Sequence, residues 1–344
     1  FARSEINMGV DAFRDSLYAM LKRNTFLNIK FENMLDTLGQ MSRTDIYSSL
    51  KEWEQLTPLP FYSIGEPELT KVVNKGGEEF FVLKVLVSNN SDYDGIIQMN
   101  VLQNGWWYQP LEDPRARKKV EIAAHTTKEF VSVWEEQIRE VEVNTMISGN
   151  LPYMIRQSIG NVKQERNKIV KDSIYTLPES SLEMPGEIIV DNEDSTLFVL
   201  STPPVVGLLP KWLDEVEETP FKYSGISWWR APLQWTATTN AKYYGKYIRS
   251  AYVIKSGDGS QTATWKIPVP EAGQYELYYY VFKNDELRWN DRLQGEYHFR
   301  VAYDSEVEDA YINLRKANEG WEQLGTYYFS ADTVRVVLTD ECKL

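Results

Sequence analysis

The sequence predicts a mainly β, multidomain protein in which a short helical segment precedes two β-sandwiches. Three observations support this prediction. Up to about residue 57, apolar residues recur every three or four positions, which is the spacing of amphipathic helices. From about residue 66 the period changes to two, the spacing of half-buried strands. From about residue 185, short strand-like runs separated by turn residues dominate again.

The helical segment is expected to cover residues 1–60. In VDAFRDSLYAMLKRN, the apolar residues Val10, Phe13 and Leu17 share one helical face. The run FLNIKFENMLDTLG continues this pattern, and Gly39 is expected to end its helix. A further helix is expected in RTDIYSSLKEWEQL. The prolines of TPLP then end helical structure, because proline cannot continue the backbone ladder.

Residues 65–147 predict a small β-sandwich of immunoglobulin-like type. The run EEFFVLKVLVSNN places Phe81, Leu83, Val85 and Val87 on one face, and the turn SDYDG is expected to return the chain into the partner strand IIQMNVLQ. KKVEIAAHT, KEFVSVWEE and IREVEVNTM add three short strands. Five or more short antiparallel strands in about 80 residues are typical of this sandwich.

Residues 148–184 are expected to be a connector, because one polar stretch with helical potential lies there between prolines. Residues 185–344 predict a jelly-roll-like β-sandwich that contains the strand-like runs GQYELYYYVF, GEYHFRVAY and WEQLGTYYF. Gly257-Asp258-Gly259 is expected to close a hairpin. A long irregular insertion at about 203–235 is a candidate functional segment, because such insertions often carry function.

Composition limits the function classes. A formal net charge of −13 opposes a nucleic-acid role, which needs a basic stripe, and it also disfavours binding to anionic lipid. No run of 18 apolar residues occurs, so membrane insertion is not expected. The single cysteine, Cys342, allows no internal disulfide. Because the chain starts at Phe1 and stops at a strand-like run, it is expected to be part of a longer polypeptide.

No catalytic signature occurs, so the chain is predicted to be a non-enzyme without a cofactor or metal. His125 and His298 share no motif and lack the spacing of a helical zinc site. Paired carboxylates for glycoside hydrolysis are a weak alternative, because acidic residues are abundant. Those candidates are Asp285, Glu286 and Asp291.

A second acidic run, Asp191, Glu193 and Asp194, could supply oxygen atoms to a calcium ion. It lacks the spacing and the glycine of an EF-hand loop. A solvated turn is therefore the better interpretation.

Aromatic residues supply the most suggestive candidates for ligand binding. These are Trp228, Trp229, Arg230, Trp235 and Trp289. Adjacent tryptophans on a strand face opposite sides, so one can be packed while the other is exposed. An exposed indole beside a guanidinium suits stacking on a sugar or on a partner's aromatic ring. Core packing is the alternative for all five, whereas Trp265 and Trp321, in strand-like runs, are expected in the core.

The runs IIVDNEDSTLF, GSQTATWKIPVPEAGQYELYYYV and WEQLGTYYF, within residues 185–344, resemble the golvesin C-terminal-like domain. This β-sandwich family is also called xanthan-lyase carbohydrate-binding-like, and its sugar binding is itself inferred. The resemblance implies no residue-level site. This sequence departs from the family in the insertion at about 203–235 and in ending before a closing strand with an Ala-Asp-Ala-like motif.

Residues 1–147 resemble the tail of a gluzincin-type zinc aminopeptidase. In that family, helices with a G..AF...L pattern are followed by a tryptophan, a proline-containing exit and a small sandwich. The matching positions are Gly9, Ala12, Phe13, Leu17, Trp53, the run PLPFY and the strands from Phe80. The resemblance implies a catalytic domain upstream of Phe1, so it assigns no peptidase activity to this chain.

Together these observations favour a non-catalytic C-terminal region of a larger bacterial cell-envelope protein. Its terminal β-sandwich is expected to bind a glycan or a cell-surface partner. The alternative is a purely structural or protein-interaction scaffold that packs on an upstream domain. Both resemblances suggest an extracytoplasmic location, either periplasmic or at the cell surface.

Overall fold

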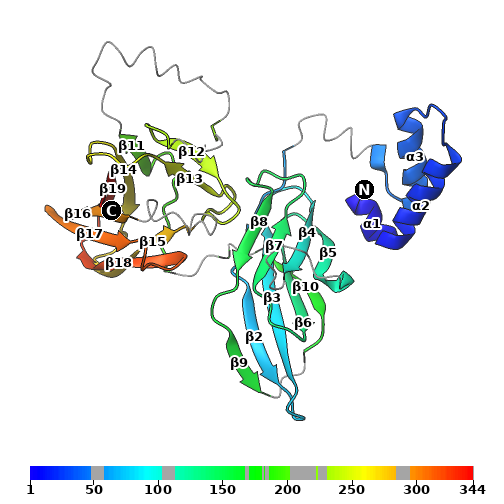
Figure 1. The fold of residues 1–344 in the computed structure, drawn as a ribbon, viewed down its shortest axis with the longest axis horizontal. Coiled ribbons are helices and arrows are strands. Elements are labelled where there is room, and N and C mark those ends of the chain that lie inside the picture. Colours follow the sequence, from blue (N-terminus) through cyan, green and yellow to red (C-terminus); the bar gives the residue numbers. More distant parts are fainter. Residues whose placement is uncertain are drawn as a thin grey trace. The chain divides into compact units, whose positions relative to one another are not determined.

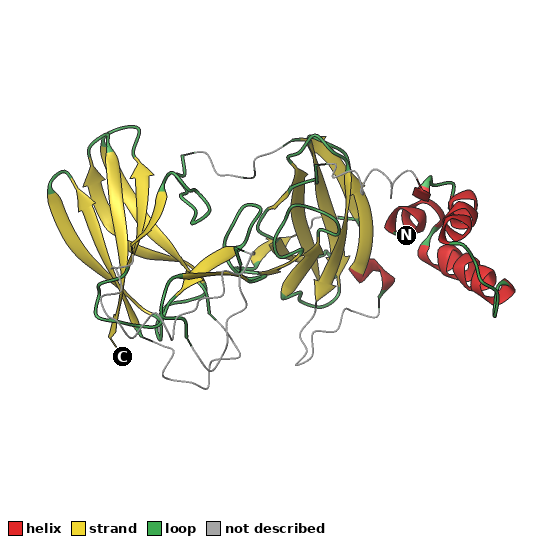
Figure 2. Ribbon diagram, turned by 90° about the horizontal axis from the view of Figure 1, so that it is seen from above, coloured by secondary structure: helices red, strands yellow, loops and turns green. Residues whose placement is uncertain are grey.

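The computed structural model describes residues 1–47, 58–102, 113–166, 170–179, 182, 186–201, 222–223, 231–283 and 295–343. The chain divides into two compact units, Phe1–Glu183 and Met184–Leu344. Strands dominate both units, and the α-helices belong to the N-terminal segment (Figures 1 and 2). A short 3-10 helix, η1 (Pro114–Ala116), lies in the first unit directly before β5. The prediction of a mainly β, multidomain protein with a short helical segment is confirmed. The immunoglobulin-like and jelly-roll-like names for the two sandwiches remain predictions.

The helical segment contains α1 (Ala2–Met8), α2 (Val10–Arg23) and α3 (Phe31–Ser42). Its core is apolar and buried, and consists of Phe13, Met20, Leu35, Leu38 and Ile46. Most of the further helix expected in RTDIYSSLKEWEQL lies outside the described residues. None of the described helices is both long and apolar enough to cross a bilayer.

The expectation that Gly39 ends its helix is wrong. α3 continues to Ser42, and the chain turns at Arg43, which has a left-handed φ of 50°. Gly39 serves a different purpose, because a Cβ atom there would lie 2.8 Å from the backbone oxygen of Thr44. The absent side chain lets the turn after the helix fold back against it.

Ion pairs attach α1 to the first sandwich. Arg3 contacts Glu121 at 2.8 Å, and Lys119 contacts Glu5. Burial lowers the pKa of Lys119, which lies partly covered between helix and strand.

Two sheets form the sandwich of the first unit as described. The first has the order β10-β6-β3-β2-β9, with β1 also paired to β3. Its strands are β1 (Tyr62–Ile64), β2 (Glu68–Val73), β3 (Glu79–Asn89), β6 (Thr126–Trp134), β9 (Lys163–Arg166) and β10 (Ser173–Pro178). The second has the order β5-β4-β7-β8. Its strands are β4 (Gly95–Leu102), β5 (Arg117–Ile122), β7 (Glu140–Asn144) and β8 (Met154–Ser158).

The predicted alternation along β3 is confirmed. Leu83, Val85 and Val87 are buried in the core between the sheets, and Phe81 packs against the same core. The predicted hairpin between β3 and β4 is wrong, because the turn carries the chain from one sheet to the other. Two strands with buried apolar residues can pair in one hairpin or lie in two facing sheets. The periodicity of the sequence alone therefore does not distinguish these two arrangements.

The predicted connector, 148–184, contributes three strands instead of a helix. β8 pairs with β7, β9 runs parallel to β2, and β10 pairs with β6. Each of the three lies at an end of its sheet's strand order. Edge strands are paired on one side only and tolerate polar side chains, which explains why this segment has the composition of a connector.

The second unit, where described, contains three sheets. A five-stranded sheet has the order β11-β14-β19-β16-β17, and β15–β18 and β12–β13 form two-stranded sheets. The bounds are β11 (Phe198–Ser201), β12 (Thr236–Thr239), β13 (Ser250–Val253), β14 (Thr262–Pro268), β15 (Gly273–Val281), β16 (Glu296–Tyr303), β17 (Glu306–Asn313), β18 (Gly320–Phe329) and β19 (Thr333–Lys343).

The core of this unit lies between the five-stranded sheet and β15–β18. Phe299 and Val301 of β16 and Leu338 of β19 share one buried cluster with Tyr327 and Phe329 of β18. Trp265 of β14 packs against the same cluster, as predicted.

The hairpin predicted at Gly257-Asp258-Gly259 is wrong. The strands on either side, β13 and β14, belong to different sheets. The backbone N–H of Gly257 donates to the carbonyl of Asp340 at 2.8 Å, so the turn is tied to β19 while the chain changes sheet. A glycine-rich turn specifies a reversal of direction but not the sheet that the next strand joins.

A Gly39→Ala substitution tests the close approach at the end of α3. In an ordinary helix interior, this change stabilises by about 1 kcal/mol. Here the added Cβ meets a backbone atom, so we expect the free energy of local unfolding to fall by about 1–3 kcal/mol. Hydrogen exchange of α3 amides in the full chain measures this. Thr37→Ala, at an exposed position of α3, is the control, and faster exchange specific to the Gly39 variant is the expected result.

Candidate functional site

Most of the ligand-binding residues predicted from the sequence lie outside the described residues. These are Trp228, Trp229, Arg230 and Trp289. The described member, Trp235, precedes β12 and packs against the core of the second unit. Its indole Nε1 is buried and meets no hydrogen-bond acceptor among the described atoms. For Trp235, this environment favours the packing alternative.

A different set of aromatic residues lies on the outer surface of the β15–β18 sheet. In the antiparallel register, Tyr280 lies opposite Trp321, and Tyr278 lies opposite Gln323. Trp321 is 42% exposed and Tyr278 is 43% exposed. Trp321 was expected in the core, and that expectation is wrong.

Strand alternation explains how β15 presents these rings. Leu277 and Tyr279 turn inward and pack against the core, so Tyr278 and Tyr280 point to the opposite face. Tyr279 lies against Phe299 with ring centroids 4.9 Å apart. Burial raises the pKa of the Tyr279 hydroxyl well above its ordinary value, so this ring is part of the core.

An irregularity in β18 explains the position of Trp321. Leu277 pairs with Gly325, but its neighbour Tyr278 pairs with Gln323, so Leu324 is an extra residue that forms a bulge. Strict alternation counted back from buried Phe329 would turn Trp321 inward. One extra residue reverses the alternation, and Trp321 therefore points outward.

The outward aromatic residues of this sheet, together with Tyr244, are called here the aromatic face. Its members are Tyr278, Tyr280, Trp321 and Tyr328 of the β15–β18 sheet and Tyr244 of the β12–β13 loop. Tyr244 lies 4.8 Å from Trp321 and 5.5 Å from Tyr280 between ring centroids, and Tyr280 lies 5.4 Å from Trp321. Three rings in tilted and edge-on contact support one another in fixed positions.

Buried contacts hold the β12–β13 loop in place. The buried Arg249 guanidinium donates from Nη1 to the carbonyl of Tyr243 at 3.3 Å. Tyr243 packs edge-on against Phe282 at 4.7 Å. Gly245 has a φ of 155° and leaves no room for a side chain, because a Cβ there would lie 2.0 Å from the carbonyl oxygen of Ile248. Tyr244 is therefore held against the sheet by a packed loop.

Polar groups accompany the rings. The Tyr278 hydroxyl donates to Glu276 Oε2 at 2.6 Å, and this hydrogen bond raises the pKa of Tyr278. Gln323 and Thr326 are exposed on the same side of β18. The aromatic face thus combines flat apolar surfaces with exposed hydrogen-bonding groups, which suits non-covalent binding of an amphipathic ligand.

His125 lies in the first unit, at the turn between β5 and β6. Its Nε2 contacts Asp92 Oδ1 at 2.8 Å and its Nδ1 contacts Glu179 Oε2 at 2.7 Å. The hydrogen bond to Asp92, and then that to Glu179, raise the pKa of His125 above 6.5. A neutral imidazole carries one N–H, so only the protonated ring donates to both carboxylates. This arrangement ties the end of β10 to the β3–β4 turn.

The other acidic and histidine candidates have structural partners. His298 Nε2 contacts Asp309 at 2.7 Å and its ring stacks on Tyr311. Glu193 accepts hydrogen bonds from Lys222, Tyr223 and Ser250.

Burial raises the pKa of Asp191 to about 6. No cluster of three or more His, Cys, Asp or Glu side chains that could hold a metal ion occurs in the described part of the chain. Asp285, Glu286 and Asp291, the carboxylates considered for glycoside hydrolysis, lie outside it.

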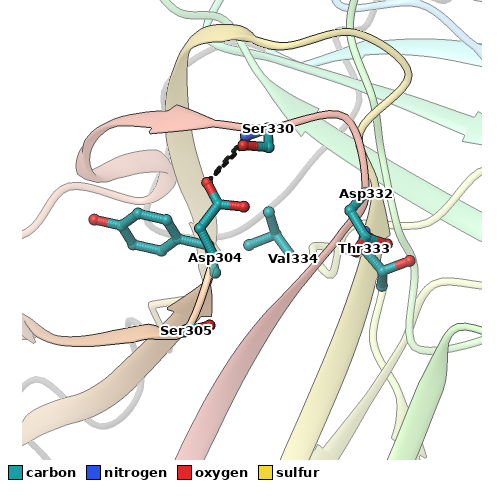
Figure 3. Close-up of a pocket in the computed structure, with 7 residues that line it drawn as sticks. Asp304, Ser305, Ser330, Asp332, Thr333 and Val334 are labelled. Carbon is teal, nitrogen blue, oxygen red and sulfur yellow. Dashed lines mark hydrogen bonds between the residues drawn. The ribbon is translucent and has the colours of Figure 1, made fainter.

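A polar pocket of about 420 Å³ lies where the β16–β17 and β18–β19 turns meet (Figure 3). Asp304 and Ser305 both have positive φ, as a tight hairpin turn requires. Ser330 donates from its hydroxyl to Asp304 Oδ2 at 2.9 Å, as the dashed line shows. The Asp304 carboxylate therefore joins the two turns.

Residues 229–343 match the family model of the Golvesin C-terminal domain. This span contains the whole aromatic face. The match supports the resemblance predicted for the C-terminal part and is compatible with a non-catalytic, carbohydrate-binding-like region. No curated protein matches the chain, and neither does any solved structure. The predicted resemblance of residues 1–147 to an aminopeptidase tail finds no support in these comparisons.

A Gly325→Ala substitution tests the bulge that turns Trp321 outward. A Cβ at this position would lie 2.8 Å from the hydroxyl of Tyr327, whose buried ring is stacked on Phe329. We expect the free energy of opening of β15–β18 to fall by about 1–3 kcal/mol. Hydrogen exchange of the two strands measures it. Thr326→Ala, at the adjacent exposed position, is the control, and equal exchange in both variants would contradict the packing argument.

His125 makes the attachment of β10 depend on pH. Because its folded-state pKa is raised, the stabilisation is fully present below the ordinary pKa of 6.5 and is lost as pH rises through the folded value. We expect the NMR titration midpoint of His125 to lie above that of the unfolded chain. Protection factors of β10 amides should decline across the same pH range. The variant His125→Gln should remove this dependence and Asp92→Asn should only reduce it, because Glu179 still contacts the imidazole. An unshifted midpoint would refute the clamp.

Proposed function

We propose that the second unit is a non-catalytic glycan-binding module of a bacterial cell-envelope protein, with the aromatic face as its binding surface. One observation carries the proposal: the half-buried rings of Tyr244 and Tyr280 contact the exposed ring of Trp321, and Tyr278 is exposed on the same side of β15. An exposed cluster of large rings is uncommon unless it contacts a partner, because burial of aromatic surface is strongly favourable.

The chemistry of the face suits a sugar. The faces of sugar rings carry C–H groups that pack on flat aromatic surfaces, while their hydroxyls need hydrogen-bond partners. Glu276, Gln323 and Thr326 offer such groups beside the rings. Because the rings are fixed by one another and by a packed loop, little conformational entropy is lost on binding. An extracytoplasmic location, where glycans are accessible, belongs to this proposal.

A second candidate function is a protein-interaction scaffold. It is favoured by apolar side chains that remain exposed on α2, where Val10 is 59% exposed and Tyr18 is 65% exposed. Exposed apolar surface of this kind is typical of a protein interface. In this reading, the helical segment packs on an upstream domain and the second unit has a structural role.

Titration with a panel of polysaccharides and oligosaccharides, with and without calcium, tests the glycan proposal. Binding is followed by tryptophan fluorescence and confirmed by calorimetry. We expect saturable binding that Trp321→Ala weakens at least about tenfold, because a central aromatic contact commonly contributes more than ~1.4 kcal/mol. Tyr311→Ala, at an exposed ring of β17 in the same unit, is the matched control and should bind normally.

A further variant, Trp228→Ala/Trp229→Ala/Trp289→Ala, tests whether the glycan binds at the aromatic face or at the residues predicted from the sequence. Loss of binding in that variant with normal binding in Trp321→Ala would move the site away from the face. Absence of binding across a broad panel would make the scaffold the better account.

A further inference from the structure

The connection between α2 and α3 exposes an unusual amount of apolar surface. It is called here the helical tip and comprises residues 21–31, LKRNTFLNIKF. Phe26 is fully exposed, and Leu27 is 64% and Phe31 60% exposed. Leu21 and Ile29 of the same segment are also exposed. The buried core of the helical segment is formed by other residues, so the apolar side chains of the tip do not contribute to that core.

The helical tip has a defined conformation. At the end of α2, Asn24 donates from its side-chain amide to the carbonyl of Met20 at 2.8 Å, and the Thr25 hydroxyl donates to the carbonyl of Lys22 at 2.9 Å. Phe26 then adopts a φ of 67°. A bulky residue in this left-handed region is strained. The strained turn directs a large ring into solvent, so the exposure of Phe26 follows from ordered local structure.

The charge of the helical tip is opposite to that of the chain. Residues 21–31 contain Lys22, Arg23 and Lys30 and no acidic residue, whereas the whole chain carries a formal charge of −13. All three cations are exposed, and none forms an ion pair with a described residue. In the sequence, the first acidic residues on either side of the tip are Asp15 on α2 and Glu32, which follows Phe31 on α3.

We propose that the helical tip docks on the anionic surface of a lipid bilayer, with Phe26 and Leu27 entering the interface and the cations contacting lipid headgroups. Apolar rings flanked by lysine and arginine are the combination that interfacial membrane segments use. A purely apolar protein groove would not account for the concentration of positive charge in an acidic chain. Because the remainder of the chain repels an anionic surface, the chain approaches tip first.

This proposal refines an expectation drawn from whole-chain charge, which disfavoured anionic lipid. Attraction to a charged surface is screened within about 10 Å, so the charge nearest the membrane decides it. The proposal is independent of glycan binding, because it rests on the first unit alone.

Vesicle flotation of the full chain tests the proposal. The vesicles contain phosphatidylcholine and phosphatidylglycerol at about 2:1, with pure phosphatidylcholine for comparison. We expect binding to the anionic vesicles that declines with salt and is weak on neutral ones. Lys22→Gln/Arg23→Gln/Lys30→Gln should weaken binding about a hundredfold, because each cation near the surface contributes about fivefold.

Phe26→Asn isolates the apolar contribution. Asparagine tolerates the left-handed conformation, so the turn should be preserved while the ring is removed. Binding to anionic vesicles should fall several-fold. Tyr153→Asn, at an exposed aromatic position of the first sandwich, is the control and should bind like the unaltered chain. Circular dichroism verifies that each variant is folded.

A fluorophore attached through Phe26→Cys, in a Cys342→Ser background, reports insertion directly. Its emission should shift to the blue with anionic vesicles only. Three outcomes would overturn the proposal: no flotation of the unaltered chain, equal binding by the tip variants, or self-association that Phe26→Asn abolishes. The last would assign the helical tip to a second copy of the chain.

Discussion

The aromatic face depends on one β-bulge. Leu324 inserts an extra residue into β18, so the strand presents Tyr327 and Phe329 to the core at one end and Trp321 to solvent at the other. Without that residue, the same strand would bury either Trp321 or Tyr328. The bulge therefore permits two requirements to be met along ten residues: a filled core beneath the sheet and an aromatic surface above it. Gly325 makes the bulge sterically feasible, because the stacked Tyr327 ring occupies the space of a side chain.

Local periodicity predicted the strands and their packed faces where alternation is regular. The inward set Leu83, Val85 and Val87 of β3 is an example. It failed for Trp321, because a bulge changes the face without leaving a periodic signal; the adjacent pair Leu324-Gly325 is the only trace in the sequence. It also failed for residues 148–184, because edge strands have polar composition. Tertiary pairing, which no local pattern contains, decided that the Gly257-Asp258-Gly259 turn joins two sheets.

The net charge of the whole chain likewise differs from the charge of a single surface patch. A formal charge of −13 describes the whole chain, whereas the helical tip contains three exposed cations and no acidic residue. Charge also organises the first unit, since Glu5 and Lys119 join α1 to β5 across more than a hundred residues of sequence. Whole-chain composition describes the average surface, and it gives no information about a patch of eleven residues.

The parallel pairing of β9 with β2 has a consequence for how the first sandwich forms during synthesis. β2 begins at Glu68, but its outer partner ends at Arg166, and the partner of β6 ends at Pro178. Until those residues have left the ribosome, both margins of the larger sheet expose unpaired backbone groups that can join another chain. Pairing over such sequence separations is intrinsically slow. A chain shortened before Lys163 would retain most of the buried core and yet be prone to aggregate, so a fragment with both sheet edges paired extends to Pro178.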